Sequence, residues 1–149
     1  MRGAVLLVLF SAIAAPAAAQ RVQPEVRFDL VGPRPYSPQA GVGGSVAVGV
    51  YTRMSAAVGW GPRRSTGVSG GGGEWRGDLA VRVTLDPYRQ QRWALAFGGG
   101  VSVRRHAYLA VLVDLEGPER FGWLPVMQAG VGGGFRAGVI LRRAAAGRR

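Results

Sequence analysis

Residues Glu74 to Pro87 read EWRGDLAVRVTLDP, and two kinds of side chain alternate along this stretch. The odd positions are apolar apart from Gly77, and they are Trp75, Leu79, Val81, Val83 and Leu85. The even positions are polar, charged or small, and they are Glu74, Arg76, Asp78, Ala80, Arg82, Thr84 and Asp86. A period of two predicts a β-strand with one apolar and one polar face. The fold therefore depends on which of the two faces points inward.

The same alternation recurs along the chain in segments that are separated by turn residues. Apolar residues of one parity mark six further segments: Val26, Phe28 and Leu30; Val42, Val46, Val48 and Val50; Met54, Ala56, Val58 and Trp60; Trp93, Leu95, Phe97, Val101 and Val103; Leu109, Val111, Val113 and Leu115; Met127, Val131, Phe135, Val139 and Leu141. No segment has helical spacing. The pattern predicts an all-β fold, an antiparallel up-and-down meander that closes into a small barrel of about eight strands.

The turns and the strand count follow from where glycine, proline and polar residues gather. Breaks are expected at residues 32–39, 61–73, 86–91 and 117–120. The apolar parity is unchanged across residues 51–53 and 104–106, which predicts three-residue hairpin loops there. Residues 125–141 keep one parity throughout, so they form either one long strand or two strands that fold back at Gly132 to Gly134. The second arrangement gives eight strands instead of seven, and the even number is favoured because single-chain bacterial membrane barrels have even counts.

The two ends of the sequence differ in composition from its centre. Residues 1–19 combine Arg2, an apolar run and a small-residue stretch before Gln20, which predicts a cleaved secretory signal peptide. Residues 20–142 form the predicted barrel domain, and residues 143–149 a basic tail. The chain has no cysteine, so an exported barrel would depend on its hydrogen-bonded ladder and its packing for stability.

The polar face of the segments indicates which side is inside. It consists largely of glycine, alanine and serine, with charged residues at intervals, and the whole chain has only eight acids and no lysine. An eight-stranded barrel has an interior just wide enough for side chains to fill. Small residues and paired charges suit such a lumen better than a solvated exterior. The predicted lumen charge network is Glu74, Arg76, Asp78, Arg82, Arg104, Asp114 and Glu116, and Asp114 with Glu116 is expected to meet Arg82 or Arg104.

Tryptophan supports an apolar exterior that faces lipid. Trp60, Trp75, Trp93 and Trp123 lie at or near strand ends, and all have the parity of the apolar face. Tryptophan collects at membrane boundaries because its ring prefers the apolar side and its N–H prefers water and headgroups. We therefore expect these four residues to form a membrane-interface belt. The alternative is that they cap an ordinary soluble core.

With these features the chain resembles the small, porin-like, eight-stranded outer-membrane β-barrel proteins over residues 24–142. The resemblance implies an outer-membrane location in a Gram-negative-type envelope, with membrane lipid or lipopolysaccharide as the partner. The chain differs from the class in its last residues, ILRRAAAGRR, which lack the terminal aromatic residue common there. Some small barrels of this class are lipid-A deacylases with histidine and serine close together on one strand. The segment VRRHAYLA does not reproduce that arrangement.

No residue pattern points to catalysis, a cofactor or a metal. His106 is the one histidine, and Ser102 lies across a predicted turn from it with no acid nearby in sequence to orient the ring. A metal site would depend on Asp114 and Glu116 alone. The glycine-rich residues 69–74 lack the lysine of a phosphate loop. We expect no enzymatic activity and no cofactor.

The formal charge of +11 comes entirely from arginine. Such a balance is typical of nucleic-acid binding, but an exported chain meets anionic lipid phosphates instead. Arg63, Arg64, Arg104 and Arg105 could hold such phosphates, or could simply be solvated. The leading hypothesis is a non-enzymatic outer-membrane barrel with a narrow, side-chain-filled lumen and a structural, adhesive or very small-solute role. The alternatives are a soluble periplasmic barrel that binds an apolar ligand and a lipid-modifying outer-membrane enzyme.

Overall fold

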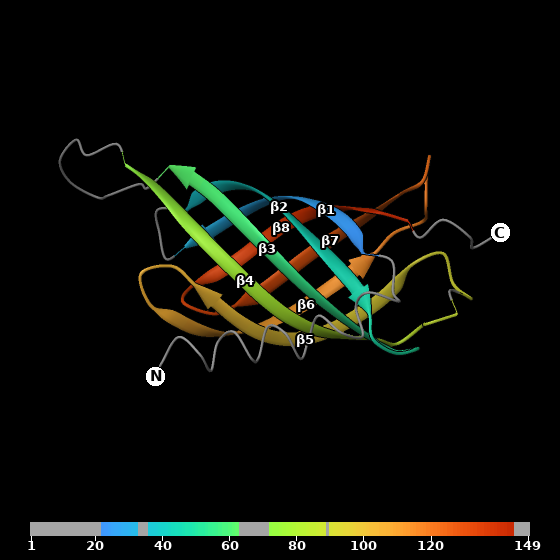
Figure 1. Ribbon diagram of the computed structural model, residues 1–149. Helices are drawn as coiled ribbons and strands as arrows, with labels where there is room; N and C mark the ends of the chain where they lie inside the picture. The colour runs from blue at the N-terminus through green and yellow to red at the C-terminus, as the bar shows by residue number, and fades with distance from the viewer. Residues whose placement is uncertain (1–21, 33–35, 63–71, 89, 145–149) are drawn as a thin grey trace.

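The computed structural model describes residues 22–32, 36–62, 72–88 and 90–144. These residues contain eight antiparallel strands that form a closed barrel. Each strand pairs with the next along the chain, and the eighth pairs with the first (Figure 1). The strands are β1 (Gln23–Gly32), β2 (Ser37–Ala47), β3 (Thr52–Pro62), β4 (Gly73–Thr84), β5 (Ala94–Val103), β6 (Ala107–Glu116), β7 (Trp123–Val131) and β8 (Phe135–Arg143). The all-β class, the meander order and the closure predicted from the sequence are confirmed.

The barrel has two ends, which differ in the connections that they carry. At the terminus end β1 begins, β8 ends, and residues 48–51, 85–93 and 117–122 join successive strands. At the opposite end β1 and β3 end, β2 and β4 begin, and the described connections are residues 104–106 and 132–134. The predicted signal peptide, residues 1–19, lies outside the described residues. Of the predicted tail, Arg143 is the last residue of β8, and residues 145–149 lie outside the described part.

The strand count is eight because the chain does fold back at Gly132 to Gly134. Val131 pairs with Phe135, and the Gly132 amide donates to the Gly134 carbonyl at 2.9 Å. All three glycines have φ between +66° and +158°, a region that other residues rarely adopt. The triplet at Gly98 to Gly100 instead lies inside β5. The two glycine triplets thus have different roles, because Gly132 to Gly134 lies between two strands and Gly98 to Gly100 lies within one.

One of the two predicted hairpin loops is at the expected position and the other is not. Residues 104–106 join β5 to β6 as predicted. The loop predicted at residues 51–53 lies at residues 48–51, with Ala47 paired to Arg53. The prediction was wrong because Val48 and Val50 continue the apolar parity into an exposed loop. Alternation indicates which residues lie on the same face, but it does not indicate the residue at which strand pairing stops.

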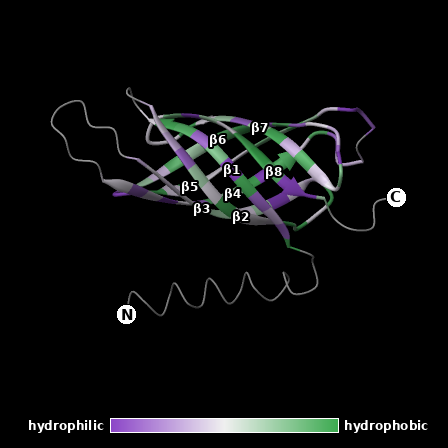
Figure 2. Ribbon diagram, turned by 90° about the horizontal axis from the view of Figure 1, so that it is seen from above, coloured by the Kyte–Doolittle hydropathy of each residue, from purple (hydrophilic) through white to green (hydrophobic). Residues whose placement is uncertain are grey.

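Burial shows that the apolar face points outward. Phe28, Val42, Leu79, Val111 and Met127 are all exposed, whereas the opposite parity is buried. The alternation is visible along the ribbons in Figure 2. Among the described residues only a small apolar cluster, Leu124, Val126 and Ile140, is packed inside together. The barrel is therefore inverted relative to a soluble protein, with polar groups at its centre.

Glycine on the inner face lets neighbouring strands approach closely. A Cβ atom on Gly98 would overlap the carbonyl oxygen of Val81, and one on Gly100 would overlap that of Leu79. Both glycines belong to β5, which pairs with β4 over this stretch. The absence of side chains there also leaves lumen space that residues of β4 and β6 occupy. The described part of the chain has no helix long and apolar enough to cross a membrane.

Candidate functional site: the ion-paired lumen

The lumen of the described barrel buries ten charged side chains. Five are acids and five are arginines: Glu25, Asp29, Asp78, Asp114 and Glu116, with Arg27, Arg76, Arg82, Arg136 and Arg142. All ten take part in at least one ion pair. The buried set is neutral, so the formal charge of +11 belongs to residues outside it. Neutral pairing is what burial requires, since an isolated buried charge is very costly.

Four of these residues form a closed ring of ion pairs, which we call the upper ring. Arg76 contacts Asp29 and, at 3.0 Å, Asp78. Arg136 contacts Asp29 at 3.2 Å and Asp78 at 3.0 Å. Arg76 and Asp78 come from β4, Asp29 from β1 and Arg136 from β8. Because β4 and β8 are four strands apart in a ring of eight, the upper ring spans the lumen from wall to wall.

A second group, the lower chain, continues the fill with Arg27, Glu25, Arg142 and Glu116. Glu25 accepts from Arg27 at 2.6 Å and from Arg142 at 2.7 Å. Arg142 also donates to Glu116 at 2.5 Å. The lower chain thus joins β1, β8 and β6. It contains two acids and two arginines, so it too is balanced.

Arg82 on β4 reaches across β5 to Asp114 on β6. Its Nε lies 2.6 Å from Asp114, and its Nη1 donates to Ser55 on β3 at 2.5 Å. Asp114 also accepts from the Gln128 amide on β7 at 2.7 Å. The ladder places Gly98 of β5 beside Arg82, so no inner side chain blocks this path. One buried pair therefore connects four strands, β3, β4, β6 and β7.

The seven charges predicted for the lumen divide into two groups. Arg76, Asp78, Arg82, Asp114 and Glu116 are buried, and the expected pairing of Asp114 with Arg82 is present. Glu116 meets Arg142, which was not on the predicted list. Glu74 and Arg104 are half-buried near the opposite end, and neither forms an ion pair with another described residue. Burial lowers the pKa of Arg104, and the neighbouring Arg76 guanidinium lowers it further.

The remaining five members of the buried set are residues that the predicted network omitted. They are Glu25, Arg27, Asp29, Arg136 and Arg142. Their parity carried the signal, because each lies opposite the apolar positions of its own strand. Parity does not indicate the ion-pair partner of each residue, since Arg142 and Glu25 are separated by 117 positions in sequence.

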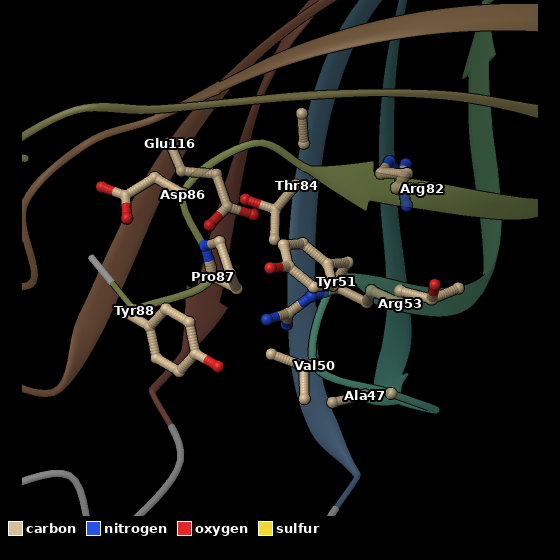
Figure 3. A pocket seen from close by; sticks show the side chains of 13 residues that line it. Ala47, Val50, Tyr51, Arg53, Arg82, Thr84, Asp86, Pro87, Tyr88 and Glu116 are labelled. Atoms are coloured by element: carbon tan, nitrogen blue, oxygen red, sulfur yellow. The ribbon is translucent and has the colours of Figure 1, made fainter. Parts of the chain in front are cut away.

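A pocket of about 230 Å³ opens at the terminus end, below the lower chain. In Figure 3 the side chains of Arg53, Thr84 and Glu116 are turned into it, and the ring of Tyr88 lies at its edge. Arg82, with its ion pair to Asp114, also lines this pocket. The pocket is thus lined by apolar and polar residues together, and two of them, Arg82 and Glu116, belong to the ion-paired fill.

The four tryptophans lie at both ends of the barrel wall. Trp60 pairs directly with Trp75 near the opposite end. Trp93, just before β5, and Trp123, the first residue of β7, lie at the terminus end. Trp60, Trp75 and Trp93 are exposed, and Trp123 is half-buried beneath the Arg143 guanidinium, 5.5 Å from its ring. Each end of the described barrel thus carries two tryptophans on or near its outer face.

The residues considered for catalysis or metal binding lie apart from one another. Ser102 is buried in the lumen, whereas His106 is exposed in the following turn, where its ring is edge-on to that of Tyr108 with 6.3 Å between the ring centroids. Asp114 and Glu116 both pair with arginines. No group of three or more potential metal ligands is found within the described ranges. Arg105 is exposed beside His106, and Arg63 and Arg64 lie outside the described residues.

Comparisons with known proteins give information on the fold alone. The sequence matches no protein-family model, and no curated protein sequence matches it. Among solved structures, the chain is similar to TMB2.3, a de novo designed transmembrane β-barrel determined by solution NMR. The TM-score is 0.58 at 11% sequence identity, over 82% of this chain and 93% of the designed one. The chain is therefore an antiparallel eight-stranded barrel that resembles a designed membrane barrel.

Proposed function

We propose that the chain is a non-enzymatic, integral outer-membrane β-barrel whose lumen is closed by ion-paired side chains. The observation that carries the proposal is the inversion of the barrel, with ten charged residues buried and the apolar faces of the strands exposed. Soluble monomers rarely expose continuous apolar surface on this scale. Lipid accommodates such a surface, and a closed ladder leaves no strand edge unpaired within it.

The strand lengths suit the thickness of a bilayer. The described strands contain 9 to 12 residues. A membrane-spanning strand needs about 9 to 11 residues at its usual tilt. Trp75 lies ten residues before Leu85 along the chain. The Leu85 amide donates to the Leu95 carbonyl, so these two leucines are at the same height on the barrel, and Trp93 lies two residues further toward the terminus end. The tryptophans at the two ends are thus separated by roughly 25–30 Å along the barrel axis, so they support the predicted interface belt.

The closed lumen limits what the barrel could transport. The upper ring and the lower chain lie in series between the two ends, and both join separate walls. The role that fits is structural or adhesive, or the passage of a very small solute, with outer-membrane lipid or lipopolysaccharide as the surrounding partner. The charged interior also argues against an apolar ligand held inside a soluble barrel.

Fractionation of cells that express the full chain tests the proposal. We expect the protein in the outer membrane after a carbonate wash, and we expect it to migrate differently on a gel before and after heating. A soluble periplasmic barrel would instead be released by osmotic shock, and that result would overturn the proposal. An unchanged lipid composition on expression of the chain and of a His106→Ala variant is expected, since no lipid-modifying activity is proposed.

A matched pair of arginine substitutions tests the direction of the apolar face. Leu79 lies near the middle of β4 and is 47% exposed, whereas Leu85 lies past its end and is 60% exposed. In a bilayer, Leu79→Arg should cost about 2–4 kcal/mol of unfolding free energy and Leu85→Arg about 0–1 kcal/mol. Urea unfolding in lipid vesicles measures both. Equal and negligible effects would place Leu79 in water.

A further inference from the structure

The connection between β6 and β7 presents an exposed phenylalanine at its tip. Phe121 is 99% exposed, the largest exposed fraction among the large apolar side chains described. In Figure 1 this connection, orange in the colour scale, projects sideways from the terminus end of the barrel. Because its side chain is almost fully exposed, Phe121 contributes nothing to the interior fill.

The tip is held in a fixed and unfavourable conformation. Arg120 and Trp123 exchange two backbone hydrogen bonds of 2.9 Å, with Phe121 and Gly122 as the two central residues of the turn. Their φ angles are +53° and +75°, as in a type I′ turn, which prefers asparagine or glycine at both places. A bulky residue with positive φ is a conformational outlier. An exposed aromatic residue in such a position is costly to the isolated fold, and such outliers often mark functional contacts.

Arginines flank the tip on both sides. Arg120 precedes Phe121 and is exposed, and Arg143 is exposed over the Trp123 ring. The Ala144 amide donates to the Gly122 carbonyl at 2.9 Å, which ties the end of β8 to the tip. Glu119 is the exposed acid of this connection. Two guanidinium groups, one tryptophan and one phenylalanine therefore share one projection, which we call the β6–β7 foot (Arg120–Trp123 with Arg143).

We propose that the β6–β7 foot binds the anionic phospholipid surface at the terminus end, with Phe121 inserted at the acyl boundary and Arg120 and Arg143 against lipid phosphates. The inference rests on the proposed membrane location. The chemistry is complementary: arginine matches phosphate geometry, tryptophan prefers the headgroup level, and phenylalanine can be buried at the boundary between headgroups and acyl chains. Arg120 and Arg143 are both exposed and outside the neutral buried set, so lipid phosphates can reach them.

Site-directed spin labelling tests the depth of the foot, because the chain has no cysteine of its own. Phe121→Cys, Leu79→Cys and Tyr88→Cys would each be labelled with a nitroxide and reconstituted as the full chain in vesicles of phosphatidylcholine with phosphatidylglycerol. Tyr88 lies on another connection at the same end and is 71% exposed. We expect labels at 79 and 121 to be relaxed more by oxygen than by a water-soluble nickel chelate, and the label at 88 to show the reverse.

The arms of this experiment separate the two proposals. If the label at 121 matches that at 88 while the label at 79 is in lipid, the foot is solvated and the inference is overturned although the membrane barrel stands. If the label at 79 is in water, the membrane location itself fails. Arg120→Gln with Arg143→Gln, or vesicles of phosphatidylcholine alone, should shift the label at 121 toward water. Insertion that is unaffected by both changes would overturn the phosphate contact.

Phe121→Asn distinguishes a membrane contact from a structural role. Asparagine suits the positive φ at this position, so the thermal unfolding temperature in detergent micelles should be unchanged or higher. A fall in that temperature would mean that Phe121 holds the fold together, and it would overturn the inference.

Discussion

Each buried charge in the lumen depends on specific partners. Arg82 is 2% exposed and Asp114 is 0% exposed, and the two are 2.6 Å apart. A buried ion pair adds little net stability over an apolar pair of the same size, but removal of one partner is costly because the other charge remains buried. We therefore expect the lumen charges to select which strands face each other more than they strengthen the fold.

Reversal of the charge at Arg82 should strongly destabilise the barrel. Arg82→Glu would place two buried carboxylates side by side and leave Asp114 without its cation, at a cost of about 3–5 kcal/mol. Urea unfolding in detergent micelles, followed by tryptophan fluorescence, measures the change. Arg105→Glu is the control, since Arg105 is exposed and a surface change costs within about 0.5 kcal/mol. An unfolding midpoint that is the same for both variants would contradict the pairing.

At the level of the strand, β5 is shaped by its glycines. Three consecutive glycines, Gly98 to Gly100, lie within one continuous strand, where glycine is normally unfavourable. Two of them face inward, where their lack of a Cβ lets β4 approach and leaves room for the Arg82 side chain to reach β6. The cost in backbone entropy is thus linked to the closure of a narrow barrel.

Addition of one methyl group at Gly100 tests this account. In Gly100→Ala the new Cβ would overlap the Leu79 carbonyl oxygen, so we expect a loss of about 1–3 kcal/mol through overpacking. Gly77→Ala on the adjacent strand is the matched control, because a Cβ there meets nothing within 4 Å. Its expected effect is neutral or slightly stabilising. The two variants would be compared by the urea midpoint in detergent micelles, and equal effects would exclude the close approach.

For the whole molecule, we propose that two balanced layers of ion pairs close the lumen in series. The upper ring spans from β4 to β1 and β8, and the lower chain spans from β1 and β8 to β6. Either layer alone is enough to stop ion flow if side chains fill the cross-section at that level. On this proposal, a barrel that is polar inside need not be a channel.

Planar-bilayer recording tests the two-layer closure. The native chain should show no conductance steps, and neither should Arg76→Ala with Asp78→Ala or Glu116→Ala with Arg142→Ala. Each double change removes one acid and one arginine and leaves Asp29 with Arg136, or Glu25 with Arg27, as a pair. The four changes together should give small conductance steps, with heat-modifiable migration as the check on folding. Steady conductance of the native chain would disprove the closed lumen.

The sequence by itself indicated most of the strands, which residues share a face and the meander order, because alternation with a period of two is local and survives any change of partner. It placed Arg76, Asp78, Arg82, Asp114 and Glu116 on the inner face for the same reason. Only the tertiary structure decided that β2 ends at Ala47, that Glu74 and Arg104 stay outside the network, and that Arg142 joins Glu25 to Glu116. Those outcomes depend on register and closure, which bring together residues far apart along the chain, and no local pattern encodes which strands will face each other across the lumen.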